Sequence, residues 1–222
     1  MCGRYALYTE TEQWTESGMG WPGEEGFAWR PSYNVAPGTM APVVVDRGGP
    51  VIAMHRWGLV PSWAREPAIG NRMINARAET LTEKPAFRAA ARRRRCLVPA
   101  NGFYEWQKSG KGKIPHYIHP RSGRLLAFAG LWESWSDPAG EPLNSFTIVT
   151  VEPNRLLAPI HDRMPAILAP EQYERWLDPR PMDGEQLRSL LSPLPDPELE
   201  AYPVSTLVNR PGNDSDRCIA PI

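Results

Sequence analysis

Proline is the residue type that most limits how this chain can fold. The 222 residues include 25 prolines, together with 18 glycines. Because proline lacks a backbone N–H and disrupts the interior of a helix, long helices are disfavoured and short strands joined by turns are favoured. A hydrophobic content of 41% with nine tryptophans excludes a disordered chain. We therefore expect an ordered, strand-rich fold.

The segments between the turns give a coarse map of the fold. Extended segments are predicted at residues 41–45, 51–60, 95–107, 114–120, 125–135, 145–153 and 200–209, with a hairpin turn at 108–113. Short helices are predicted after Thr9 or Thr11, at 169–177 and at 183–192, and residues 75–95 are helical in composition. We expect the α+β class with a mainly antiparallel β core, barrel-like or two-sheet, and peripheral short helices. One domain would span residues 1–222.

Charge and cysteine content restrict the function classes. The formal net charge is zero, so any basic surface must be local, and most of the run Arg92 to Arg95 is expected to be a solvated helix end. No apolar run approaches the roughly 20 residues that cross a bilayer, which favours a cytoplasmic protein without a membrane partner. Cys2, Cys96 and Cys218 fit neither a disulfide framework nor a zinc site, so we expect no metal and no cofactor.

Cys2 follows the initiator methionine, and this position has chemical consequences. A side chain as small as that of cysteine generally permits removal of Met1, which leaves a free amine and a thiol on the same carbon. With pKa values of about 8 and about 8.5, both groups are partly nucleophilic at neutral pH. Such an aminothiol condenses with an aldehyde to an imine and then closes to a five-membered thiazolidine. Cys2 is therefore the candidate reagent.

Other polar residues stand in strand-like or aromatic settings. Asn34 is most simply a turn former before Pro-Gly, and Glu79 a helix-start carboxylate or an ion-pair partner. Glu105 lies between two aromatic residues, so its carboxylate is either on the wet face of a strand or buried with a raised pKa, and both interpretations stay open. His161 lies in a loop after a strand. Together with Glu105 and Asn75, it offers the base and the donors that an aminothiol needs.

Six blocks and a C-terminal one carry a family resemblance: "MCGR", "YNVAPG", "WGLVPSW", "INARAET", "GFYEW", "IHDRMP" and finally "PVSTLVN". In this order, spanning nearly the whole chain, they resemble the SRAP family, the SOS response-associated peptidases or abasic site processing proteins. The resemblance implies covalent crosslinking to abasic sites in single-stranded DNA through a thiazolidine on Cys2. The crosslink would protect the lesion during replication. Single-strand to duplex junctions, a monomeric state and nucleoid association during DNA damage are implied as well.

The resemblance also implies roles for individual residues. Cys2 would supply the amine and thiol, Glu105 would be the general acid/base, His161 would assist proton transfer and reversal, and Asn75 would orient the intermediate. The implied DNA contacts are Arg4, Asn34, Trp63, Arg77, Trp106 and Arg163. For Trp106, a position in the hydrophobic core is expected as much as a contact with DNA.

Two side activities belong to the same expectation. The family's name as a peptidase would describe self-removal of Met1. An imine at C1′ acidifies the C2′ protons, so elimination and strand cleavage, an AP-lyase activity, is chemically accessible. One departure from the family pattern concerns the residue after Trp63, where some relatives carry a second tryptophan and this chain has Ala64. The stacking surface would be smaller here.

Two other function classes fit part of the sequence. The glutaminase domains of N-terminal-nucleophile amidotransferases also begin with Met-Cys-Gly, and there the thiol attacks a glutamine amide. The blocks that follow Gly3 do not resemble such a domain. A non-catalytic binder of single-stranded DNA would use the arginines and tryptophans alone, without any need for Cys2.

Overall fold

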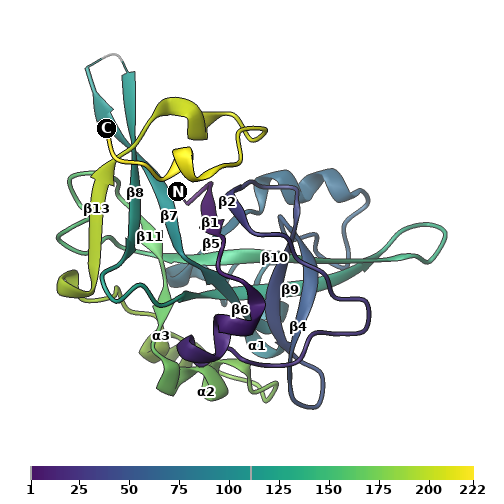
Figure 1. Ribbon diagram of the computed structural model, residues 1–222. Coiled ribbons are helices and arrows are strands. Elements are labelled where there is room, and N and C mark those ends of the chain that lie inside the picture. The colour runs from purple at the N-terminus through teal and green to yellow at the C-terminus, as the bar shows by residue number, and fades with distance from the viewer. Residues whose placement is uncertain (1, 111) are drawn as a thin grey trace.

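Two β-sheets make up most of the computed structural model, which describes residues 2–110 and 112–222 (Figure 1). Met1, whose removal is predicted, lies outside the described residues. The strands are β1 Tyr5–Leu7, β2 Ser32–Val35, β3 Met40–Asp46, β4 Pro50–Trp57, β5 Asn75–Arg77, β6 Arg95–Ala100, β7 Gly102–Ser109, β8 Gly112–Pro120, β9 Leu126–Ser136, β10 Pro142–Val151, β11 Met164–Pro165, β12 Ile167–Leu168 and β13 Leu199–Pro203.

One sheet closes on itself into a barrel. Its strand order is β11-β10-β4-β3-β6-β9-β12, and β9 pairs not only with β6 but also with β10. This extra pairing joins β10, β4, β3, β6 and β9 in a ring, because every neighbour in that path is hydrogen-bonded to the next. Strand β10 runs parallel to β4 and to β5, whereas the other pairings among the described strands are antiparallel. The expectation of an α+β fold with a mainly antiparallel, barrel-like core is confirmed.

The other sheet has the order β13-β8-β7-β1-β2 and is antiparallel throughout. Its β7–β8 hairpin pairs Ser109 with Gly112, which agrees with the turn predicted at 108–113. Side chains alternate along β7: Phe103 belongs to the main core, whereas Tyr104 belongs to a smaller aromatic cluster with Tyr117. Because alternate residues share a face, Glu105 lies on the same face of β7 as Phe103.

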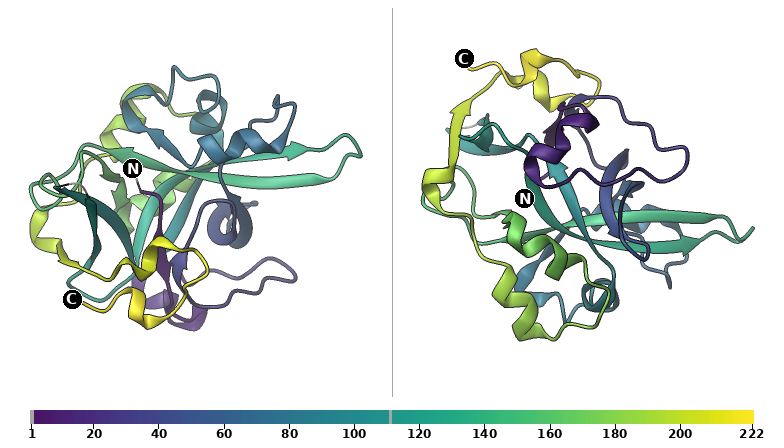
Figure 2. Two further views of the ribbon diagram at one scale, coloured as in Figure 1. Left: turned by 90° about the horizontal axis from the view of Figure 1, so that it is seen from above. Right: turned by 60° about the horizontal axis from the view of Figure 1, so that its bottom comes forward.

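The helices are short and peripheral, as proline content predicts. The α-helices are α1 Arg88–Arg93, α2 Tyr173–Leu177 and α3 Gly184–Leu190, and the 3₁₀ helices are Thr11–Ser17, Pro67–Arg72, Ala78–Thr80, Pro170–Gln172, Asp196–Glu198, Thr206–Asn209 and Asp216–Cys218. The helices predicted at 169–177 and 183–192 therefore form. Helix α3 is capped by the Asp183 carboxylate, which accepts hydrogen bonds from the N–H groups of Glu185 and Gln186. In Figure 2, α2 and α3 lie together at one end of the molecule.

The first helix differs in detail from its prediction. It begins after Glu10 as the 3₁₀ helix Thr11–Ser17, and no side chain caps it. The Thr9 hydroxyl instead accepts a hydrogen bond from the Asn101 amide at 2.6 Å. The helix ends at Gly18, whose φ of 74° is a conformation that glycine adopts without strain.

The helical expectation for residues 75–95 is wrong for most of that segment. Only Arg88–Arg93 form an α-helix, while Asn75–Arg77 form strand β5 and Arg95 begins β6. Strand β5 is held by its pairing with Ile148 to Thr150 of β10, a long-range interaction that overrides local composition. Pro85 lies in the turn region between these elements and precedes α1.

The arginine run divides into exposed and buried side chains. Arg92 and Arg93 are exposed, as expected for a solvated helix end. Arg94 forms an ion pair with Glu133 at 2.6 Å. Arg95 is buried, and its guanidinium donates to the carbonyl oxygens of Trp176, Ala91, Arg92, Asp178 and Arg180. Arg95 therefore ties α2 and the segment after it to the end of α1.

Candidate active site

Cys2 lies three residues before the start of β1 and is completely buried. Strand β1 sits between β2 and β7 in the sheet, so the strand that follows Cys2 is an interior strand and not an edge strand. The Cys2 thiol Sγ donates to the Arg4 carbonyl oxygen at 3.7 Å. Burial, and next the nearby Glu105 carboxylate, raise the pKa of this thiol far above its ordinary value. At neutral pH the resting thiol is therefore protonated.

Glu105 occupies the middle of β7 and is 1% exposed. Its position opposite His116 in the β7–β8 hairpin places it on the face that it shares with Phe103. Burial raises the pKa of the carboxyl to about 7. Of the two interpretations left open by the sequence, the buried carboxylate with a raised pKa is thus the one found. A carboxyl with this pKa is divided between its two protonation states at neutral pH.

His161 lies in the loop between β10 and β11, as predicted, and faces Glu105. Its Nε2 is 3.7 Å from Oε2 of Glu105. Its Nδ1 accepts a hydrogen bond from the backbone N–H of Arg163 at 3.0 Å. Burial lowers the pKa of the imidazole, so the ring is mainly neutral at neutral pH. Glu105 and His161 are therefore neighbouring acid/base groups, one with a raised pKa and one with a lowered pKa.

Asn75 is the first residue of β5, opposite Ile148 of β10. Both polar atoms of its side-chain amide are buried, and neither has a hydrogen-bond partner among the described residues. The backbone just before it is fixed, because the Trp57 indole N–H donates to the Ile74 carbonyl at 2.9 Å. A buried amide without partners costs folding free energy, and such groups are concentrated at functional sites. Asn75 is thus available for a ligand.

Arg163 is 8% exposed, and its guanidinium is engaged within the protein. It donates to both carboxylate oxygens of Glu79, at 2.8 and 2.9 Å, and to the Thr150 carbonyl oxygen at 2.6 Å. Glu79 lies in the first turn of the 3₁₀ helix Ala78–Thr80, so both sequence interpretations of Glu79 apply at once. Hydrogen bonding to Arg163 lowers the pKa of Glu79. The predicted contact of Arg163 with DNA stays a prediction.

Arg4 and Asn34 hold the C-terminal segment. Arg4 donates to the Asn34 Oδ1 at 2.8 Å and to the Val208 carbonyl oxygen at 2.6 Å. The Asn34 amide nitrogen lies 2.7 to 3.2 Å from the carbonyl oxygens of Val208, Arg210 and Asn213. In Figures 1 and 2 this segment lies across β1 and β2. Sequence reasoning missed this role, and the block "PVSTLVN" was the only signal pointing to the segment.

The remaining predicted DNA contacts are on or near the surface. Arg77 at the end of β5 is exposed, and Trp63 is 59% exposed. Trp63 lines a cavity of about 440 Å³ together with Arg65, Ile69 and Arg72. The Trp106 indole N–H donates to the Asn209 Oδ1 at 2.8 Å, and the ring is half-buried. Trp106 was expected either in the core or in contact with DNA. The half-buried ring is neither a fully buried core residue nor a fully exposed one.

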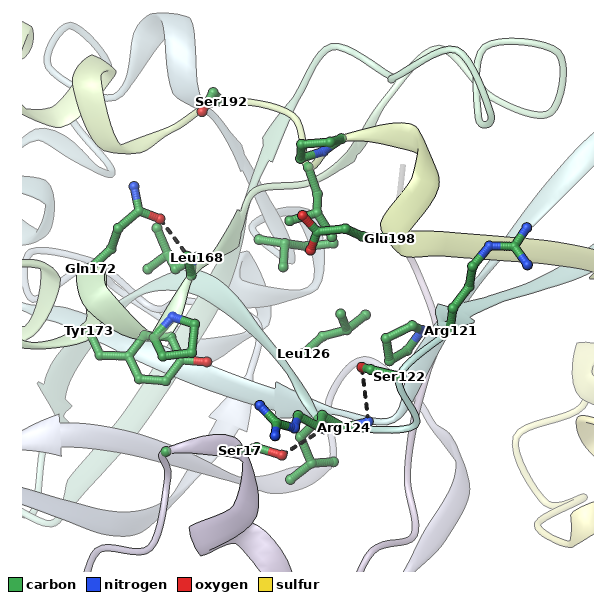
Figure 3. Close-up of a pocket in the computed structure, with 18 of the residues that line it drawn as sticks. Ser17, Arg121, Ser122, Arg124, Leu126, Leu168, Gln172, Tyr173, Ser192 and Glu198 are labelled. Atoms are coloured by element: carbon green, nitrogen blue, oxygen red, sulfur yellow. Dashed lines mark hydrogen bonds between the residues drawn. The ribbon is translucent and has the colours of Figure 1, made fainter.

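A separate cavity of about 1050 Å³ lies away from these residues (Figure 3). Its walls come from the end of the first 3₁₀ helix, the β8–β9 turn, the start of α2 and the segment before β13. Figure 3 shows Arg124, Tyr173 and Glu198 around it. None of the predicted site residues lines it. Within residues 2–110 and 112–222, no group of His, Cys, Asp or Glu side chains could hold a metal ion.

The site combines four groups with one kind of chemistry. They are a buried thiol from the segment before β1, a carboxyl with a pKa of about 7 from β7, a neutral imidazole from the β10–β11 loop and an unpartnered amide from β5. This combination suits nucleophilic attack on a carbonyl carbon with proton transfer at the carbonyl oxygen.

Comparison with known proteins places the chain in a family. Residues 1–211 match the family model described as SOS response associated peptidase (SRAP). The chain is therefore a member of the SRAP family, as its motifs predicted. Because the model ends at residue 211, a single domain over residues 1–222 stays a prediction. No helix in the described part of the chain is long and apolar enough to cross a membrane.

Individual relatives match along most of their length. The chain is 46% identical to abasic site processing protein YoqW of Bacillus subtilis (strain 168), covering 99% of both sequences. It is 34% identical to abasic site processing protein HMCES of Xenopus tropicalis, covering 100% of this chain and 78% of that protein. A crystal structure of a protein from Bacteroides thetaiotaomicron superimposes with a TM-score of 0.89, with 28% identity and full coverage of both chains.

Proposed function

We propose that this protein processes abasic sites in DNA by forming a covalent thiazolidine between Cys2 and the aldehyde of the opened abasic sugar. The names of the relatives support abasic-site processing. The observation that carries the chemistry is the meeting of Cys2 with Glu105 and His161 in a buried site. Single-stranded DNA, including its junctions with duplex, is the proposed partner. Association with the nucleoid during DNA damage is part of the same proposal.

The reaction balances without any further reagent. After Met1 is removed, the Cys2 amine attacks C1′, and the carbinolamine loses its oxygen as water to give an imine. The thiol sulfur then bonds to C1′, and the thiol hydrogen ends on the ring nitrogen. One aldehyde and one aminothiol thus yield one thiazolidine and one water.

Glu105 serves both halves of this reaction. With a pKa of about 7, it is protonated in a large fraction of molecules at neutral pH and donates its proton to the departing oxygen. The carboxylate that remains accepts the proton of the Cys2 thiol, which burial keeps protonated in the resting site. His161 exchanges protons with Glu105, whose Oε2 lies 3.7 Å from Nε2 of the imidazole. Asn75 offers its buried amide to the sugar or to the Cys2 amine.

The predicted DNA contacts fall into two groups in this proposal. Arg77, Trp63 and Trp106 have accessible surface, so phosphate contact by the arginine and base stacking by the tryptophans are proposed for them. The polar groups of Arg4, Asn34 and Arg163 are engaged within the protein, and their contact with DNA stays a prediction. Because such a site would contact only a few phosphates, it does not require a basic surface over the whole protein, and the formal net charge of the chain is zero.

The side activities follow from the same intermediate. Before the ring closes, the imine acidifies the C2′ protons, and loss of one of them to Glu105 or His161 would cleave the strand by elimination. Once the thiol has closed the ring, the imine no longer exists and the elimination cannot occur. Removal of Met1 by the site itself is proposed as the meaning of the family's name as a peptidase, with no activity on other proteins.

The proposal is tested with two single-stranded oligonucleotides, one with a true abasic site and one with a tetrahydrofuran analogue that has no aldehyde. A complex that survives denaturing electrophoresis is expected only with the first. Cys2→Ala should abolish it, and Cys218→Ala, at a buried cysteine elsewhere, should retain it. A complex with the analogue, or none with the abasic site, contradicts the proposal. Release of ammonia from glutamine would favour the amidotransferase class instead.

A further inference from the structure

The contacts of Nδ1 of His161 require explanation, because they are mixed in kind. The ring nitrogen accepts from the Arg163 backbone N–H at 3.0 Å. It also lies 3.3 Å from the Arg163 carbonyl oxygen and 3.1 Å from Oδ1 of Asp162. One neighbour is a donor and two are acceptors. The ring therefore keeps a partner at Nδ1 whether or not that nitrogen carries a proton.

The backbone N–H and carbonyl oxygen of Arg163 supply two of these contacts. The side chain of Arg163 holds this backbone in place. The guanidinium is fixed by both Glu79 oxygens and by the Thr150 carbonyl, with the three distances between 2.6 and 2.9 Å. Thr150 pairs with Pro165 across β10–β11 and with Arg77 across β10–β5. A planar guanidinium held at three points fixes the adjoining backbone more firmly than a lysine could.

From these contacts we infer that the Glu79–Arg163 ion pair is a positioning device for His161, which fixes the Arg163 peptide so that Nε2 stays directed at Glu105 in either protonation state. The inference rests on the proposed function and adds residues that do not touch the reacting atoms. Glu79 and Arg163 act on the reaction through His161. Breaking their pair lets the imidazole turn away from Oε2 of Glu105.

The charged and titratable groups that face His161 must stay unaltered in the variants. They are Glu105 from β7, Asp162 in the same loop and Lys113 from β8. Because none of them is altered in Glu79→Gln or Arg163→Lys, a changed pH profile in these variants reports the placement of the ring. Glu133→Gln is the matched control, since Glu133 forms a similarly short ion pair with Arg94 on another face of the fold.

The experiment measures the rates of crosslink formation and reversal from pH 5.5 to 8.5 with an abasic oligonucleotide. Glu79→Gln and Arg163→Lys should slow both rates by about 10-fold and shift the pH profile, as expected when a proton-transfer partner is misplaced. In a His161→Ala background, Glu79→Gln should have no further effect. Glu133→Gln should leave both rates unchanged. Additive effects of Glu79→Gln and His161→Ala would overturn the inference.

Two further readouts separate this inference from its alternatives. If Arg163 contacts a phosphate and does not place His161, Arg163→Lys and Glu79→Gln change the affinity for DNA but leave the crosslinking rate at saturating DNA and its pH profile unchanged, and the inference fails. If the wild-type protein forms no crosslink, the proposed function fails. The inference is then decided by an NMR titration of His161 in the free protein. Glu79→Gln should move the imidazole nitrogen shifts, and unmoved shifts would overturn it.

Discussion

Oε2 of Glu105 and Nε2 of His161 lie 3.7 Å apart, although the two residues come from a sheet strand and from a distant loop. Burial raises the pKa of Glu105 to about 7 and lowers that of His161. At neutral pH the carboxyl is therefore divided between its two protonation states beside a mainly neutral imidazole, so the site can donate or accept a proton. This relationship suits a reaction that runs forward to the crosslink and backward to release.

Glu105→Gln should slow crosslinking about 100-fold, because the amide cannot donate or accept the transferred proton. In the wild-type protein the rate should fall as the pH rises through about 7, where the carboxyl loses its proton. The variant should lack this inflection. Single-turnover rates across the pH range check both points. An inflection that persists in the variant would remove Glu105 from its role.

The same substitution should stabilise the fold at neutral pH. The pKa of Glu105 rises from 4.5 unfolded to about 7 folded, so the folded state binds more protons between these values. The contribution of Glu105 to stability is therefore greatest below pH 4.5 and is lost as the pH rises through 7, by up to about 3 kcal/mol. Urea denaturation should show Glu105→Gln more stable than wild type at pH 8, with the difference vanishing near pH 4.5. Equal stability at pH 8 would contradict the burial argument.

Asn75→Leu should separate function from stability. Leucine has the branched shape of asparagine without its polar atoms, and the amide it replaces has no partner among the described residues, so the midpoint of unfolding should hold or rise. Crosslinking should fall by roughly 100-fold. Asn101→Leu is the contrast, because the Asn101 Oδ1 accepts from the N–H groups of Tyr8 and Thr9 at 2.7 and 3.0 Å. That variant should unfold more easily and still crosslink below its midpoint.

His55 should produce a pH dependence opposite to that of Glu105. The ring is fully buried against Trp132, and neither nitrogen has a partner among the described residues. Burial, with a smaller contribution from Arg47, lowers the pKa from 6.5 to about 3. The unfolded state then binds more protons between these values, so stability is complete above pH 6.5 and falls toward pH 3. His55→Phe should flatten this acid limb, and an unchanged limb would show that other groups cause it.

Asn34→Ala should loosen the C-terminal segment. It removes the amide that approaches three carbonyl oxygens and leaves Arg4 without its Oδ1 acceptor. We expect a loss of about 2 kcal/mol in unfolding free energy and faster proteolysis between residues 204 and 222. The DNA affinity measured below the unfolding midpoint distinguishes the roles. An unchanged affinity assigns Asn34 to the fold, whereas a weaker one assigns it to DNA.

Local pattern was sufficient for some elements and insufficient for others. The extended segments β3 and β4, which lie between Pro-Gly and Gly-Gly turns, and the 108–113 turn were predictable, because strand-forming residues and turn residues act over a few positions. Strand β5 was not predictable, since its pairing with Ile148 to Thr150 depends on residues far away in the chain. The closing of the barrel by β9 and β10 was not readable for the same reason.

The site, too, was predictable from the sequence only in part. The motifs identified Cys2, Glu105, His161 and Asn75 as candidates, and their chemistry followed from residue type. Whether Glu105 was wet or buried depended on which face of β7 meets the core, which no local pattern decides. The partnership of Glu79 with Arg163 required two separate motifs to meet in space.

Covalent capture by Cys2 is tested most directly by the intact mass of the purified protein before and after reaction with a single-stranded oligonucleotide carrying one abasic site. The mature protein should lack Met1 and gain the mass of the oligonucleotide less one water, in an adduct that withstands heating. Cys2→Ala should show no heat-stable adduct. Retention of Met1 in a crosslinked protein, or an adduct that Cys2→Ala also forms, would contradict the account.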